Sequence, residues 1–127
     1  MNPADTKILI VEDEGIVAIG IKATLLGFGY KVLPIAISGE SAIRIASEHK
    51  PDLVLMDIKL RGRLNGIETA TVLIRQYSTP VIYCTAHSDP ATMEAAQGTS
   101  PSAILMKPVS DSDLKAAVQH ALGFEEQ

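Results

Sequence analysis

The chain has one cysteine, no tryptophan and few aromatic residues, which make up 4% of its 127 residues. The single cysteine, Cys84, excludes an internal disulfide, and its apolar neighbours predict a buried, reduced thiol. Basic residues are not in excess: the formal net charge is −4, which argues against direct nucleic-acid binding. No apolar run approaches the roughly 20 residues that cross a bilayer, and Met1–Thr6 lacks a signal-peptide pattern. We therefore expect a cytoplasmic protein that has no membrane as a partner.

Five short apolar runs alternate with five stretches of helical periodicity. The apolar runs are rich in β-branched residues, which is typical of strands buried on both faces of a sheet. They are Lys7–Val11, Tyr30–Ile37, Asp52–Met56, Pro80–Thr85 and Ala103–Met106. The alternation predicts one α/β domain over residues 1–127, with a core from about residue 7 to 122. The expected fold is flavodoxin-like, a doubly wound five-stranded parallel sheet in the order 2-1-3-4-5 with five helices.

The five helical stretches carry apolar residues at steps of three and four. The first three have the stripes Ile16, Ile19, Ala23 and Leu26; Ala42, Ile45 and Ala46; and Ile67, Ala70, Leu73 and Ile74. The last two are expected over Pro90–Gln97 and Ser110–Leu122. Ser38 and Ser110 are the expected N-caps of the second and fifth helices. Gly27 is a residue that commonly ends a helix such as the first.

Chemically active side chains stand at the ends of four expected strands. Glu12 and Asp13 follow the first strand, Asp57 follows the third, Thr85 ends the fourth and Lys107 follows the fifth. In doubly wound sheets the carboxyl ends of the strands form the edge where ligands bind. Clustered carboxylates repel one another unless a cation neutralises them, and Mg2+ prefers carboxylate oxygens. Each residue alone has an ordinary structural explanation, but together they indicate a cation site beside a carboxylate nucleophile, Asp57.

These positions, with Pro108 and the turn Asn65-Gly66-Ile67-Glu68, resemble the signature of response-regulator receiver domains of two-component systems. The likeness extends from Lys7 to Leu122. It implies a phosphoacceptor domain, not an enzyme with an external substrate, in which Asp57 receives a phosphoryl group. The donor would be a histidine kinase or a phosphotransfer protein, and phosphorylation would switch protein–protein contacts.

The resemblance also implies a role for each site residue. Mg2+ would be bound by Asp13, Asp57 and the backbone carbonyl of Lys59, with Glu12 acting mainly through metal-bound water. Lys107 would pair with the phosphoryl oxygens. Thr85 would hydrogen-bond a phosphoryl oxygen and draw in the loop after its strand. The Lys107–Pro108 peptide bond would be cis.

The chain departs from the family pattern at two places. Ile104 stands where the family usually has Tyr or Phe three residues before the site lysine, which puts a coupled threonine–aromatic switch in doubt. The loop from Lys59 to Leu64 is about one residue longer than usual and carries three positive charges. A basic loop is most often simply solvated, but Lys59 is also a candidate to lie near the phosphoryl group and alter its lifetime. His87 is interpreted as a solvated loop histidine.

Two other function classes stay open. A receiver-like interaction module would bind partners without phosphorylation, which Ile104 allows. A phosphatase of the haloacid-dehalogenase type also phosphorylates an aspartate, but it carries a second aspartate where this chain has Lys59. The sequence does not identify the output partner, a fused output domain or the cognate kinase, and it leaves homodimerisation open.

Overall fold

The computed structural model describes residues 2–86 and 89–124 of the chain. Strands and helices alternate along it, after a short 3-10 helix at Pro3–Asp5. The elements are β1 (Lys7–Val11), α1 (Gly15–Gly27), β2 (Lys31–Val32), α2 (Gly39–His49), β3 (Leu53–Met56), α3 (Gly66–Tyr77), β4 (Val81–Thr85), α4 (Pro90–Gln97), β5 (Ala103–Met106) and α5 (Asp111–Leu122). Among the described residues, no helix combines the length and hydropathy that crossing a membrane requires.

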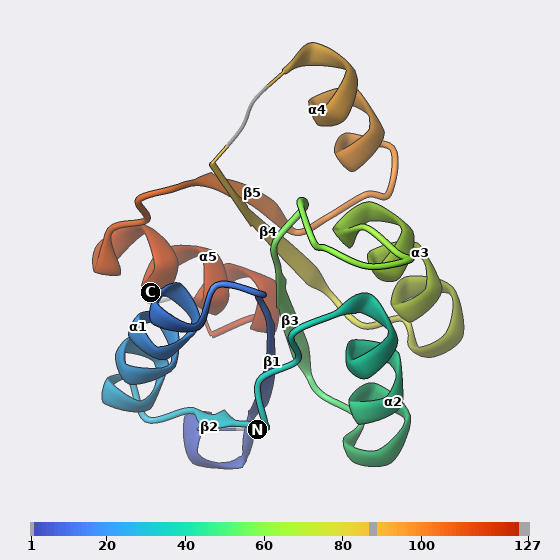
Figure 1. The fold of residues 1–127 in the computed structure, drawn as a ribbon. Coiled ribbons are helices and arrows are strands. Elements are labelled where there is room, and N and C mark those ends of the chain that lie inside the picture. Colours follow the sequence, from blue (N-terminus) through green and yellow to red (C-terminus); the bar gives the residue numbers. More distant parts are fainter. Residues whose placement is uncertain (1, 87–88, 125–127) are drawn as a thin grey trace.

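The strands form one five-stranded sheet in the order β2-β1-β3-β4-β5, and every pairing is parallel. Helices α1 and α5 lie on one side of this sheet, and α2 and α3 lie on the other (Figure 1). The buried apolar residues divide in the same way, into one cluster that includes α1 and α5 and another that includes α2 and α3. The doubly wound architecture and strand order predicted from the sequence are therefore confirmed.

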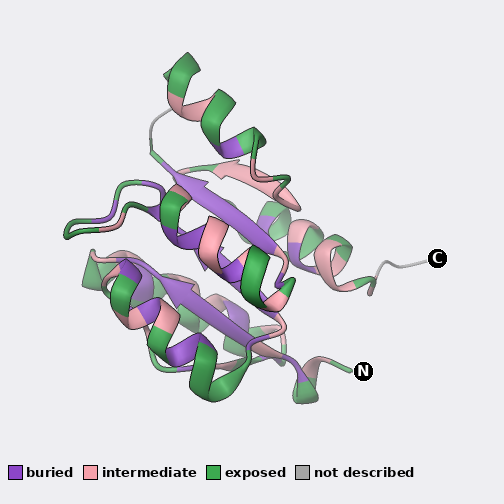
Figure 2. Cartoon of the chain, turned by 90° about the vertical axis from the view of Figure 1, so that its right-hand side faces the viewer, coloured by how far each residue is buried: buried purple, intermediate pink, exposed green. Residues whose placement is uncertain are grey.

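The central strands are the most buried part of the chain, as Figure 2 shows. All residues of β3 and β4 are buried, and β1 is buried from Ile8 to Val11. Residues that follow these strands emerge directly from the core at one edge of the sheet. The sheet therefore fixes the position of the side chains that follow β1 and β3 and that end β4.

The second strand is much shorter than the predicted Tyr30–Ile37. Only Lys31 and Val32 pair continuously with β1, and beyond them Ala36 forms an isolated bridge with Val11. Pro34 lies between these two pairings and has no N–H to donate to a ladder. The predicted strand was wrong in length for this reason.

The first helix forms as predicted, but its apolar stripe faces outward. Residues Ile16, Ile19 and Leu26 are 89%, 65% and 50% exposed. The buried residues of α1 are instead Ala18 and Leu25. Because α1 is apolar on more than one side, its periodicity identified a helix without identifying the face that packs on the sheet.

The turn that leads into α3 packs against the backbone of Asp57, the residue that follows β3. Asn65 caps the helix by accepting from the Glu68 amide, and the Gly66 amide donates to the Ile58 carbonyl at 2.8 Å. A Cβ atom at Gly66 would lie only 1.9 Å from the Asp57 carbonyl oxygen. Glycine at this position therefore allows the start of α3 to pack against the backbone of Asp57.

Replacing Gly66 by alanine should force these two backbone segments apart. We expect Gly66→Ala to lower the free energy of unfolding by about 2 kcal/mol or more, because a rigid backbone contact cannot give way. Gly20→Ala is the matched control, since a Cβ at Gly20 meets nothing within 4 Å. In a helix interior that change should stabilise the chain by about 0.5–1 kcal/mol. Urea unfolding measures both, and a Gly66→Ala variant as stable as the wild type would contradict the packing described.

Candidate functional site

Three carboxylates gather at the carboxyl edge of the sheet. Glu12, Asp13 and Asp57 each offer an oxygen within 4.8 Å of the others. Glu12 and Asp13 follow β1 directly, and Asp57 follows β3, which is hydrogen-bonded to β1 in the sheet. Two carboxylates about 4 Å apart repel by roughly 4 kcal/mol at an effective dielectric near 20, so this cluster requires positive charge close by.

Lys107, which follows β5, supplies part of that charge. Its Nζ donates to Glu12 Oε1 at 2.5 Å and lies 3.6 Å from Asp57 Oδ2. The Glu12 side chain is only 2% exposed, so this ion pair is shielded from solvent. Burial alone would lower the pKa of Lys107, but the hydrogen bond to Glu12 and the charge of Asp57 raise it above its usual value. Lys107 is therefore a cation held between the two carboxylates.

Asp57 is a buried carboxylate whose pKa is raised by its surroundings. Its Oδ1 accepts a hydrogen bond from the Lys59 amide at 3.3 Å. Burial and the neighbouring charge of Glu12 raise the pKa of Asp57 to about 6, although Lys107 opposes the shift. In the absence of a further cation, a positive or electrophilic group close to Asp57 would stabilise the charged form of this carboxylate.

Asp13 is bound by Arg61, a contact that the sequence pattern did not predict. Asp13 Oδ2 accepts from the Arg61 amide at 3.0 Å and from Arg61 Nε at 3.2 Å. Burial alone would raise the pKa of Asp13, but these donors lower it below its usual value. The long basic loop after β3 is the sequence feature that could have indicated this contact, although a basic loop is most often solvated.

The remaining predicted residues surround a small pocket at this edge. Its volume is about 180 Å³, and its lining residues are Glu14, Asp57, Lys59, Thr85, Ala86 and Lys107. Thr85 is 1% exposed, and Lys107–Pro108 is a cis peptide bond as expected. Every residue expected at the site therefore lies at this edge of the sheet. His87, interpreted from the sequence as a solvated loop histidine, lies outside the described residues.

Ile104 lies in β5, beside Tyr83 of β4 in the sheet register. It is partly buried and packs against the apolar cluster on the α2 and α3 face. Tyr83 is fully buried, and its hydroxyl lies 2.8 Å from Thr99 Oγ1. The position of the usual family aromatic is thus occupied by an aliphatic side chain in contact with the core.

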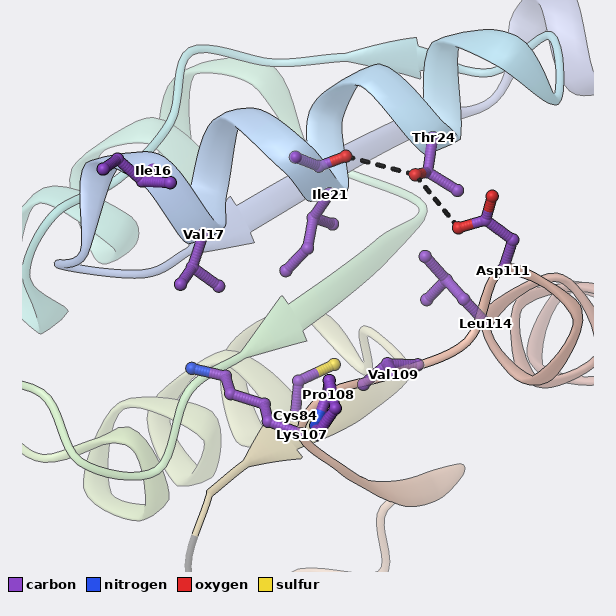
Figure 3. A pocket seen from close by; sticks show the side chains of 11 residues that line it. Ile16, Val17, Ile21, Thr24, Cys84, Lys107, Pro108, Val109, Asp111 and Leu114 are labelled. Atoms are coloured by element: carbon purple, nitrogen blue, oxygen red, sulfur yellow. Dashed lines mark hydrogen bonds between the residues drawn. The ribbon is translucent and has the colours of Figure 1, made fainter.

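A second, larger cavity lies between α1 and α5 (Figure 3). Its volume is about 420 Å³, and its lining is mostly apolar, including Ile16, Val17 and Leu114. Lys107 and Cys84 also line it, so it adjoins the carboxylate cluster. The predicted burial of Cys84 is confirmed, and burial raises the pKa of its thiol to about 12, so the thiol stays protonated and unreactive.

The carboxylate cluster fits a small divalent cation. Mg2+ binds oxygen ligands at about 2.1 Å, so two oxygens that share one ion lie at most about 4.2 Å apart. The three oxygens here lie within 4.8 Å of one another, and small side-chain rotations would close that difference. Carboxylates are also the donor type that this ion prefers.

Known proteins resemble this chain in sequence and in fold. The family described as "Response regulator receiver domain" matches residues 8–119. The chain is 33% identical over 122 residues to the phyllosphere-induced regulator PhyR of Methylorubrum extorquens, covering 95% of this chain and 45% of PhyR. It is 35% identical over 116 residues to the transcriptional regulatory protein PdtaR of Mycobacterium tuberculosis, covering 91% of this chain and 56% of PdtaR. The chain thus spans about half the length of these relatives.

Comparison with solved structures also finds receiver domains. The signal receiver domain of a modulated diguanylate cyclase from Desulfovibrio desulfuricans superposes with a TM-score of 0.89 and 36% identity. The match covers 93% of this chain and 94% of that one. The family match over residues 8–119 includes Glu12, Asp13, Asp57 and Lys107.

The raised pKa of Asp57 predicts a gain in stability when its charge is removed. The unfolded chain releases this proton near pH 3.8 and the folded chain near pH 6, so the folded state is penalised above that range. We expect Asp57→Asn to raise the free energy of unfolding by about 1–2 kcal/mol near pH 7, allowing for solvent screening. The gain should vanish below about pH 4, where both states are protonated.

Urea unfolding in metal-free buffer at a series of pH values measures this difference. Asp5→Asn, which removes an exposed charge far from the cluster, serves as the control and should show no comparable gain. An Asp57→Asn variant that is equally or less stable near pH 7 would mean that Asp57 is not strained by its surroundings.

Proposed function

This chain belongs to the response regulator receiver domain family, and from that premise we propose that Asp57 accepts a phosphoryl group. The observation that carries the proposal is the gathering of three carboxylates and one lysine at the sheet edge, around a pocket open to solvent. The donor is a phosphohistidine on a histidine kinase or a phosphotransfer protein. The activity is phosphoacceptance by the domain itself and not turnover of an external substrate.

Mg2+ is the proposed cofactor, held by Asp13, Asp57 and the backbone carbonyl of Lys59, with Glu12 acting through bound water. When bound, it supplies positive charge to the phosphoryl oxygens and to the carboxylates around it. The observation that supports this assignment is the close approach of the Glu12, Asp13 and Asp57 oxygens.

Asp57 is the nucleophile in this proposal. One carboxylate oxygen forms a bond to phosphorus while the bond between phosphorus and the donor nitrogen breaks, and its electron pair returns to the imidazole. Lys107 lies within 3.6 Å of the same carboxylate and would move its charge from Glu12 toward the phosphoryl oxygens. Hydrolysis later restores the carboxylate, as water attacks phosphorus and the aspartyl oxygen leaves.

The switch is proposed to pass through Thr85 and the loop that follows it. A phosphoryl group adds nearly two negative charges to the pocket and favours arrangements that donate hydrogen bonds to it. Thr85 lines that pocket and ends β4. A movement of its hydroxyl toward the phosphoryl group would therefore pull the loop between β4 and α4 toward the pocket. Ile104 offers no aromatic ring to follow this movement, and transmission would rest on the loop alone.

The phosphodonor is proposed to dock over the first turns of α1. A partner that delivers a phosphoryl group to Asp57 must cover the edge of the sheet, and Glu14 of the pocket lies directly before α1. Ile16 and Ile19 are largely exposed there, and Ile16 also lines the cavity between α1 and α5. The output partner, or the output domain of a longer protein such as those the relatives represent, would recognise the phosphorylated state.

Phosphorylation by a small donor tests the central proposal directly. With acetyl phosphate and Mg2+, intact-protein mass spectrometry should show one added phosphoryl group, mapped to Asp57 after borohydride trapping. Asp57→Asn or removal of the metal with EDTA should abolish the adduct. Asp52→Asn, which changes an aspartate at the opposite end of β3, is the control and should still be modified. A wild-type chain that acquires no phosphoryl group, or acquires it elsewhere, would contradict the proposal.

Docking over α1 predicts a difference between small and protein donors. Ile16→Ser should leave modification by acetyl phosphate unchanged, because Ile16 is not part of the pocket around Asp57. It should slow transfer from a phosphorylated histidine kinase that modifies the wild-type chain, by about tenfold if a well-packed apolar contact is lost. Leu26→Ser, at the far end of the same helix, is the control and should transfer normally. Equal transfer rates for both variants would exclude this docking face.

A further inference from the structure

Arg61 places a guanidinium on one carboxylate of the acidic cluster. Its backbone amide and its Nε both donate to Asp13 Oδ2, at 3.0 and 3.2 Å. The Arg61 side chain is 84% exposed, whereas that of Asp13 is only 11% exposed. A solvent-exposed cation therefore binds a largely buried carboxylate that belongs to the proposed metal site.

The loop after β3 presents Arg61 to this carboxylate through its backbone. Leu60, immediately before it, is 8% exposed and packs in the apolar cluster on the α2 and α3 face. Gly62, immediately after it, has a φ of +107°, a conformation that favours glycine. Because the chain is anchored on one side of Arg61 and turns on the other, the amide is fixed at Asp13. The guanidinium alone is free to leave.

The two Arg61 donors occupy one oxygen of a carboxylate that belongs to the proposed metal site. A carboxylate oxygen has two lone pairs, and Asp13 Oδ2 accepts two N–H groups. A divalent cation at about 2.1 Å from either oxygen of this carboxylate would repel a guanidinium held at hydrogen-bond distance. Exposed ion pairs are weak, so the guanidinium can be displaced into solvent.

We propose that Arg61 competes with Mg2+ for Asp13. In the metal-free protein its guanidinium neutralises Asp13, as Lys107 neutralises Glu12 and Asp57. When the metal binds, the guanidinium swings into solvent while the amide continues to orient Asp13. Arg61 thus lowers the affinity for Mg2+ and couples the loop after β3 to metal occupancy. This inference rests on the proposed function, because it takes the acidic cluster to be the metal site.

Calorimetric titration with MgCl2 tests this role without requiring phosphorylation. Arg61→Gln keeps the amide but removes the guanidinium, and it should bind Mg2+ about two- to fivefold more tightly than the wild type, the range a weak ion pair allows. Arg63→Gln is the matched control, since it removes the same charge two residues away. In the described part of the chain no ion pair forms at Arg63, so its affinity should stay close to that of the wild type.

Nitrogen NMR gives a second readout that a purely structural role would not change. The Arg61 Nε resonance of the wild-type protein should shift on addition of MgCl2 as the contact with Asp13 breaks, while the Arg63 Nε resonance should not. If Arg61→Gln and Arg63→Gln bind Mg2+ equally tightly, or if Arg61 Nε does not respond, the competition is excluded while the proposed function stands. If the wild-type chain does not bind Mg2+ at all, both the proposed function and this inference fail.

Discussion

The site depends on keeping several carboxylates close together at the edge of a parallel sheet. Burial prevents water from screening them, and their mutual repulsion would otherwise oppose folding. The chain offsets this cost with cations on other elements: Lys107 after β5 binds Glu12 and approaches Asp57, and Arg61 in the loop after β3 binds Asp13. The two cations differ in exposure. Lys107 is held inside the site, whereas the guanidinium of Arg61 is exposed to solvent.

This arrangement connects the fold to the chemistry. Parallel pairing of β1, β3, β4 and β5 brings residues that are distant in sequence to a single edge. Gly66 lets the start of α3 approach the backbone of Asp57. Asp57 is therefore held by α3 and by the strands β1 and β4, which lie on the two sides of β3. A carboxylate in this position has a raised pKa, and a positive or electrophilic partner would stabilise its charged form. The same preorganisation supports the proposed binding of a cation and a phosphoryl group.

Much of this could be predicted from the sequence because the signals were local. Periodicity and β-branched runs identified the α-helices and the strands, though not the 3-10 helix at Pro3–Asp5. Their alternation identified the parallel sheet and the edge where Glu12, Asp57 and Lys107 meet. The errors arose where local pattern and tertiary context disagree. Pro34 shortened the second strand, and the stripe containing Ile16 faces solvent because α1 is apolar on several sides. The contact between Arg61 and Asp13 depends on how a loop closes in space, which no spacing in the sequence encodes.

A crystal structure of the chain with Mg2+ and beryllofluoride would test the central claim most directly. The account predicts the fluoride complex on Asp57, the metal between Asp13 and Asp57, and Lys107 turned from Glu12 toward a fluorine atom. Ligand density away from Asp57, or Lys107 still paired with Glu12 beside an occupied site, would contradict it.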